Sequence, residues 1–143
     1  MAARLQGFPR LTADADITPA ADSDNLERLA AALRDLDARI FTEAVPEGLP
    51  FDVSAAMFER AELWNLVTNA GRLDVAFTPS GTSGFEDLER GAVTFHVYDT
   101  DLLAASLEDI LRSKRAADRP QDRQDAVILQ AMIERRGDGG DHR

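Results

Sequence analysis

The chain contains no cysteine and only two histidines among its 143 residues. Without cysteine it can form neither a disulfide nor a thiolate metal site, which favours a cytoplasmic protein. His96 lies within a predicted strand and His142 near the end of the chain. We therefore expect neither a Ser-His-Asp arrangement nor a His-rich metal centre. Carboxylates and basic side chains are left to carry any chemistry.

Long apolar runs are also missing. No stretch approaches the ~18 apolar residues of a membrane span, so we expect no membrane association. Arg4, Pro9 and Arg10 interrupt the N-terminal segment, so it does not read as a signal peptide.

Positive charge is scarce: 16 Lys and Arg against 26 Asp and Glu give a formal net charge of -10. This argues against general binding of nucleic-acid backbones, which needs clustered basic residues. It still allows a small anionic substrate that enters with Mg²⁺. One local basic patch is present, at Arg112, Lys114, Arg115 and Arg119.

Two carboxylates one residue apart are the most informative local pattern. Residues 12–17 read Thr-Ala-Asp-Ala-Asp-Ile, and in an extended strand Asp14 and Asp16 would lie on one face. Such neighbours repel each other unless a cation lies between them. Because Mg²⁺ is typically held by a few carboxylates plus substrate phosphates, the pattern predicts a metal and a nucleotide. A solvated strand end is the alternative.

Asp74 is the candidate for a third acidic group. Residues 72–77 predict a strand with Leu73, Val75 and Phe77 on one face and Asp74 on the other. Aspartate is depleted in strands, so its place among apolar residues suggests a function. The alternative is that Asp74 faces water on a half-exposed sheet.

Apolar spacing and capping signals predict an α+β fold, with a small mixed sheet that carries the acidic residues, helices packed on it and a helical C-terminus. We expect one domain over residues 1–135 and a disordered tail over residues 136–143. Helices are predicted over residues 2–6, 24–38, 55–60, 85–90, 107–117 and 121–135, and strands over residues 12–17, 64–68, 72–77, 92–98 and 102–105.

Three segments, taken in order, resemble those of a known family. Residues 10–17 are similar to its acidic motif, residues 64–74 and 81–88 to its hairpin and loop, and residues 106–122 to its Lys-containing helix followed by Arg-Pro-x-Asp. The family is the nucleotidyltransferase superfamily, in the small bacterial branch that includes nucleotidyltransferase-like toxins of type IV toxin–antitoxin systems. The resemblance extends over residues 1–133.

The resemblance implies Mg²⁺-dependent transfer of a nucleotidyl group from an NTP to a hydroxyl group. The acceptor would be a tRNA, a protein or a small molecule, and a cognate antitoxin would be a partner. Asp14 and Asp16 would hold one or two metal ions. Asp74 would complete the metal site or accept the proton of the attacking hydroxyl. Lys114 would offset the charge of the triphosphate; its alternative is a solvated helix residue.

Three further residues have two interpretations each. Asp122 would position Lys114 or the substrate, or it would cap the last helix. Arg10 and Arg119 would contact phosphate, or they would form ion pairs with nearby acids.

The chain departs from the family pattern at its N-terminal end. The family places a Gly-Gly or Gly-Ser pair before the helix that precedes the acids, and backbone N–H groups there cradle phosphates. Met1 stands where the residue after that pair belongs. We thus expect either a start further upstream or a domain without its phosphate cradle. The hypotheses are an enzyme, which we favour, a catalytically impaired module that binds a partner, and an acidic domain whose carboxylates are solvated.

Overall fold

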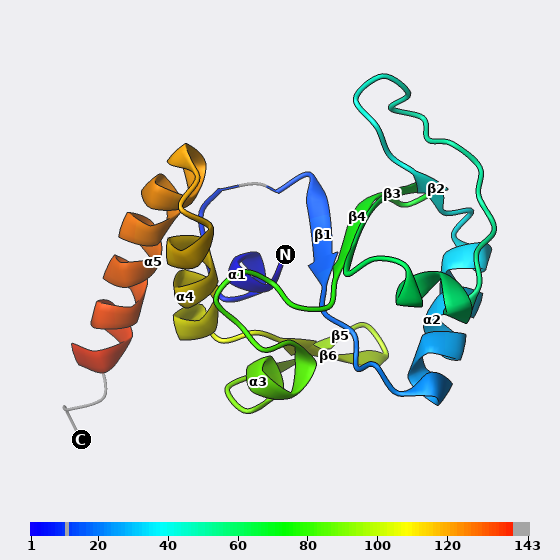
Figure 1. The fold of residues 1–143 in the computed structure, drawn as a ribbon. Coiled ribbons are helices and arrows are strands. Elements are labelled where there is room, and N and C mark those ends of the chain that lie inside the picture. The colour runs from blue at the N-terminus through cyan, green and yellow to red at the C-terminus, as the bar shows by residue number, and fades with distance from the viewer. Residues whose placement is uncertain (11, 139–143) are drawn as a thin grey trace. The chain divides into compact units, whose positions relative to one another are not determined.

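The computed structural model describes residues 1–10 and 12–138, and it confirms the α+β class. The described residues form five α-helices, a four-stranded mixed sheet and a two-stranded sheet (Figure 1). The chain divides into two compact units. The first unit consists of residues 12–78 together with Met1, and the second of residues 2–10 and 79–138. Each has its own apolar cluster, and we describe each by itself.

The first unit is built on the four-stranded sheet, in which the strand order is β1-β4-β3-β2. β1 runs parallel to β4, and the other neighbours are antiparallel. Its elements are β1 (Asp14–Ile17), α2 (Ser23–Asp35), β2 (Arg39–Ile40), the 3-10 helix η1 (Ala55–Glu59), β3 (Leu63–Thr68) and β4 (Gly71–Ala76).

Turn chemistry explains the hairpin and the end of the first long helix. The predicted hairpin is confirmed as β3 and β4; Gly71 has a φ of 116°, a conformation that glycine adopts at little cost. The Asp22 side chain accepts a hydrogen bond from the backbone N–H of Asn25 and thereby caps α2. α2 ends at Asp35, three residues before the predicted end, because Asp37 takes a left-handed conformation with a φ of 51°.

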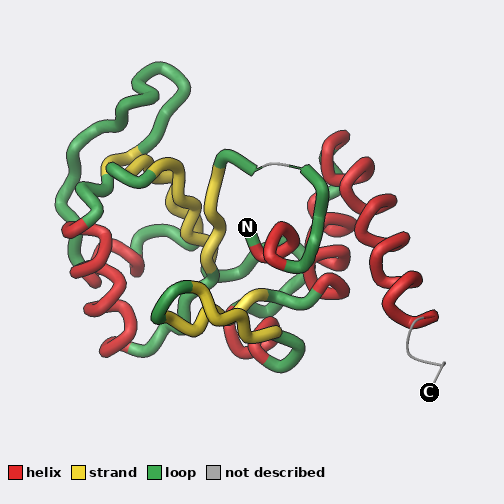
Figure 2. Tube along the Cα trace, turned by 180° about the vertical axis from the view of Figure 1, so that it is seen from behind, coloured by secondary structure: helices red, strands yellow, loops and turns green. Residues whose placement is uncertain are grey.

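One face of this sheet forms the core of the first unit. Leu66 and Val75 are fully buried there, as is Ala30 of α2. The strand β2 was not predicted, since two residues are too few for a periodic pattern. The segment between β2 and η1 is irregular, and it is drawn in green at the upper left of Figure 2. The buried members of the core are Ala30, Leu33, Ala38, Met57, Phe58, Leu66 and Val75.

The second unit is mainly helical. A small core of Phe8, Leu107, Leu111 and Leu129 joins its N-terminal segment to the two long helices. Its elements are α1 (Ala2–Leu5), α3 (Phe85–Glu89), β5 (Val93–Val97), β6 (Thr100–Ala104), α4 (Leu107–Ala117) and α5 (Pro120–Asp138).

The helices α4 and α5 meet at a sharp turn. Ser106 caps α4, which agrees with the helix predicted over residues 107–117, and the helix stops at Asp118, which has a φ of 51°. Pro120 then opens α5, a position where the missing N–H of proline costs nothing. α5 runs to Asp138, so residues 136–138 of the predicted tail are helical; residues 139–143 lie outside the described residues. Among the described helices, none is both long and apolar enough to cross a membrane.

Candidate functional site

The three predicted carboxylates lie on neighbouring strands of the first unit. In the parallel register of β1 and β4, Asp16 lies opposite Asp74 and Asp14 lies opposite Arg72. Because side chains alternate along a strand, all four residues share one sheet face, away from the core residue Val75. We call it the carboxylate face. The structure thus brings Asp14, Asp16 and Asp74 together within one unit.

Asp74 is a partly buried acid with a shifted pKa. Burial raises the pKa of its carboxyl group, the negative charges of Asp16 and Asp14 raise it further, and Arg72 partly counters them. Its Oδ1 is buried and has no hydrogen-bond partner among the described residues. A buried carboxylate oxygen in this state is stabilised by a proton or by a cation.

The carboxylates of this face are chemically compatible with a divalent cation that would share its ligands with a substrate. In the part of the chain that the structure describes, no group of three or more His, Cys, Asp or Glu side chains could hold a metal ion by itself. Mg²⁺ rarely needs such a cage, since it usually takes one or two carboxylates and completes its shell with water and phosphates. Asp16 and the unpartnered oxygen of Asp74 match that requirement.

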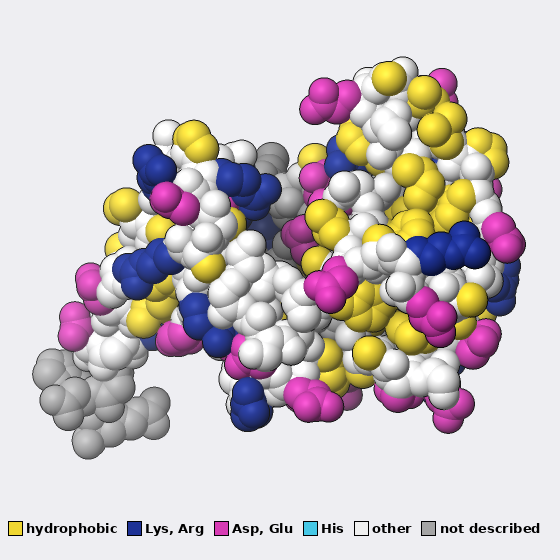
Figure 3. Space-filling view, in the orientation of Figure 1, with side chains coloured by type: hydrophobic (Ala, Val, Ile, Leu, Met, Phe, Trp, Pro, Cys, Tyr) yellow, Lys and Arg dark blue, Asp and Glu magenta, His cyan; other side chains and the backbone are white. Residues whose placement is uncertain are grey.

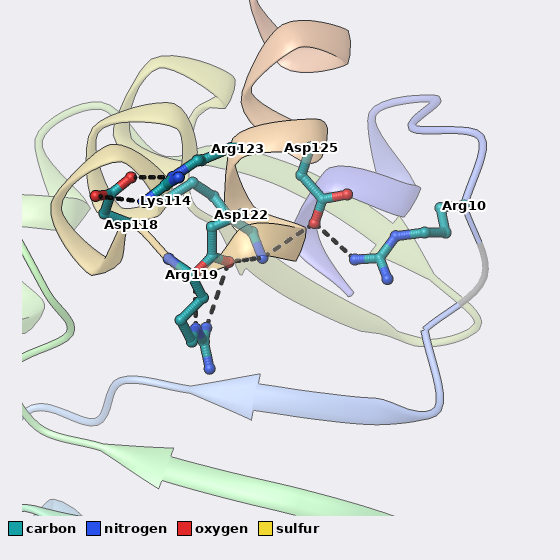
Figure 4. Close-up of polar contacts among 7 residues, drawn as sticks. All are labelled: Arg10, Lys114, Asp118, Arg119, Asp122, Arg123 and Asp125. Atoms are coloured by element: carbon teal, nitrogen blue, oxygen red, sulfur yellow. Dashed lines mark hydrogen bonds and ion pairs between the residues drawn. The ribbon is translucent and has the colours of Figure 1, made fainter.

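The remaining predicted residues form an ion-pair network in the second unit (Figure 4). Asp125 accepts from Arg10 (Nη2 to Oδ2, 2.6 Å) and lies 3.2 Å from the Nζ of Lys114. Lys114 also donates to Asp122 (Nζ to Oδ1, 2.9 Å), and the Nε of Arg119 donates to Asp122 over 2.6 Å. Three cations and two carboxylates therefore alternate from Arg10 to Arg119.

Burial divides this network into a fixed centre and accessible ends. The side chains of Asp122 and Asp125 are 2% and 3% exposed, whereas that of Arg119 is 72% exposed. Burial alone would raise the pKa of Asp122, but hydrogen bonds from Arg119 and Lys114 outweigh it and lower that pKa to about 2. Buried carboxylates of this kind need their partners in place, so they fix the three cations.

The two interpretations of Asp122 both find support in its contacts. It lies in the first turn of α5, where its Oδ2 accepts from the backbone N–H of Arg119 (3.3 Å), a contact of the capping type. The same carboxylate binds the ammonium group of Lys114. Arg10 and Arg119 form the ion pairs that were one of their alternatives. Phosphate contact by these cations stays a prediction.

Asp125 was missed by sequence reasoning. It lies three residues after Asp122 on α5, and thus on the same face of the helix, followed four residues later by the buried Leu129. Two acids three residues apart, next to apolar residues of the same helix face, were the sequence signal that could have identified Asp125 as a buried partner of the cations.

Most of the predicted basic patch is paired with acids. Arg112 bridges Asp87 and Asp109 at 3.0 and 2.8 Å, and Arg115 donates to the side chain of Gln130. Figure 3 accordingly shows basic and acidic side chains close together over α4 and α5. A further pair, Arg123 with Asp118, lies at the turn between the two helices. This surface is therefore not a uniformly basic one.

Comparison with known proteins identifies no family model and no curated relative for this chain.

Proposed function

We propose that the chain is a Mg²⁺-dependent nucleotidyltransferase-like protein that transfers a nucleotidyl group from an NTP to a hydroxyl acceptor. The observation that carries the proposal is the placement of Asp16 opposite Asp74, whose buried Oδ1 has no hydrogen-bond partner in the described part of the chain. The order of the three segments that resemble the nucleotidyltransferase superfamily agrees with it.

Each acid has a defined part in this proposal. Asp14 and Asp16 hold the metal, and Asp74 either completes the metal site or receives the proton of the attacking hydroxyl. A raised pKa suits Asp74 to proton transfer, because general bases work best near the ambient pH. Bound Mg²⁺ would supply charge compensation for the phosphates and orient the attacking and leaving oxygens.

The second unit, taken by itself, contains the three cations that we propose as phosphate-binding groups, Arg10, Lys114 and Arg119. Lys114 supplies a compact positive charge and is held by two buried carboxylates, which fixes its Nζ. Arg10 and Arg119 supply guanidinium groups whose forked N–H donors suit phosphate oxygens. The proposed acceptor is a tRNA, a protein or a small molecule.

A second candidate function is a catalytically impaired module of the same fold that binds a protein partner, such as a cognate antitoxin. The observation that favours it is the state of Lys114, whose charge is already balanced by Asp122 and Asp125. A lysine so engaged has less to offer a triphosphate.

Calorimetry of NTP binding, with and without Mg²⁺, tests the first candidate. We expect binding that needs Mg²⁺ and is lost in the Asp14→Asn/Asp16→Asn variant. The matched control is Asp35→Asn/Asp52→Asn, which removes two exposed acids from the same unit and should keep binding. Absence of NTP binding by the folded wild-type protein would refute the enzyme and leave the partner-binding module.

A further inference from the structure

Arg72 is a cation on the carboxylate face, and it forms no ion pair with the carboxylates that the structure describes. Its guanidinium carbon lies 3.4 Å from the centre of the Phe41 ring, a stacked cation–π contact. Its Nε is buried and finds no hydrogen-bond acceptor among the described residues. No ion pair within 4 Å forms to any described carboxylate, although Asp14 is its neighbour across the strands.

This state is unusual for an arginine in so acidic a chain. A guanidinium is always charged and carries five N–H donors, so leaving it half-buried without an acceptor costs free energy. The chain contains 26 Asp and Glu residues against 16 Lys and Arg, so an arginine without an ion pair is unexpected on composition alone. Stacking on Phe41 fixes the plane of the guanidinium while leaving its forked donors available, and that fork matches the oxygens of a phosphate.

The loop after β2 packs on the strands next to Arg72, on the side away from Asp14. A Cβ on Gly48 would come within 2.5 Å of Val67 Cγ1 and 2.6 Å of Arg39 Cβ, so the loop packs directly on β3 and β2. Phe41 begins that loop. Arg72 is opposite Val67 on one side and opposite Asp14 on the other, between the loop-covered strands and the carboxylates.

Arg72 also influences the pKa of Asp74, the carboxylate with a proposed role in metal binding or proton transfer. It lies two residues from Asp74 on the same face of β4, and its charge lowers the pKa that burial and the other acids raise. An anion next to Arg72 would therefore lie beside Asp14 and Asp74.

We propose that Arg72, stacked on Phe41, binds a phosphate oxyanion of the polyphosphate chain of an NTP at the edge of the carboxylate face. This rests on the proposed function, since it gives the same site a phosphate-binding residue within the first unit. It also differs from the contacts that the family resemblance implies, which involve Arg10, Lys114 and Arg119.

The test uses inorganic tripolyphosphate as a probe without divalent cations, in the full-length Asp14→Asn/Asp16→Asn background. Removing two carboxylates lets an anion approach without Mg²⁺. We expect calorimetric binding that weakens about tenfold on adding Arg72→Gln, the scale of losing a charge-assisted contact. Arg60→Gln, which removes an exposed arginine of the same unit, should change the Kd little. Arg72→Lys should give an intermediate Kd, because it keeps the charge but loses the planar fork.

Several outcomes would overturn the proposal. The first is that the Asp14→Asn/Asp16→Asn protein does not bind tripolyphosphate, and the second is that the Arg72→Gln and Arg60→Gln proteins bind it with equal affinity. The third is a loss of affinity that is seen only for an NTP titrated in parallel, which would indicate that Arg72 contacts the nucleoside. If Arg72→Gln lowers only thermal stability, the residue serves to pack Phe41. The readout needs neither Mg²⁺ nor turnover, so it remains decisive if the proposed enzyme activity is not found.

Discussion

Asp16 and Asp74 lie directly opposite each other on parallel strands, and the Oδ1 of Asp74 is buried with no hydrogen-bond partner among residues 1–10 and 12–138. Two carboxylates in this relationship are a cost to the folded chain unless a proton or a cation is present. We therefore expect a bound proton or cation to offset this electrostatic cost in the folded protein.

The first prediction concerns that cost. In Mg²⁺-free buffer at pH 7, Asp74→Asn should raise the free energy of unfolding by about 0.5 kcal/mol, the size of a cross-strand charge contact. The folded pKa of Asp74 is raised above its unfolded value of 3.8, so the penalty is absent below that pH and grows as pH rises through the folded pKa. Urea denaturation at pH 3 and pH 7 measures it. A gain of equal size at both pH values would contradict the electrostatic origin.

The second prediction has the opposite sign. The pKa of Asp122 is lowered from 3.8 to about 2, so its ionised form stabilises the fold above pH 3.8, and this contribution is lost as pH falls through 2. Asp122→Asn should cost about 2 kcal/mol at neutral pH, and the difference from wild type should shrink below pH 4. Urea denaturation across this range checks it. Asp118→Asn, which breaks an exposed pair, is the control and should have a much smaller effect.

The third prediction concerns the centre of the ion-pair network. Lys114→Gln leaves Asp122 and Asp125 buried without their shared cation, so unfolding should become easier by about 3 kcal/mol. Arg119→Gln removes a largely exposed side chain and should cost well under half as much. Thermal denaturation of the two variants compares them directly. Equal losses would mean that burial does not determine the strength of these pairs.

The fourth prediction concerns the loop that packs on the sheet. Gly48→Ala should destabilise the first unit by about 3 kcal/mol, because its φ of 91° is strained for alanine and its Cβ would collide with Val67 and Arg39. Gly71→Ala shares the positive φ, but its Cβ would meet nothing within 4 Å, so about 1 kcal/mol is expected. Chemical denaturation separates strain from collision. Similar losses in both would show that the loop can move aside.

Local signals in the sequence account for much of the fold. The helix predicted over residues 107–117 is α4, because a Ser N-cap and apolar spacing are encoded within a few positions. The β3–β4 hairpin follows from a short turn with glycine. Two further features were not accessible, since they depend on residues far apart in the chain: the two-residue strand β2 and the close packing of Gly48 on Val67.

The candidate site was predictable only in part for the same reason. The pattern of residues 12–17 identified Asp14 and Asp16 locally, but their register with Asp74 depends on a pairing between distant strands. The stacking of Arg72 on Phe41 carries no local signal either. Asp125 could have been found from its helical spacing to Asp122, because that spacing is local.

The parallel pairing of β1 with β4 has a consequence for how the first unit assembles. A hairpin such as β3–β4 closes a short loop and forms early, whereas β1 must return across nearly the whole unit to reach β4. The pairing that brings the carboxylates together therefore closes a much longer loop than the hairpin does, and it works against their mutual repulsion. A cation bound between them would stabilise this pairing, so the four-residue strand β1 would detach from β4 more readily without the cation than with it. The order of this end of the sheet would therefore indicate whether the site is occupied.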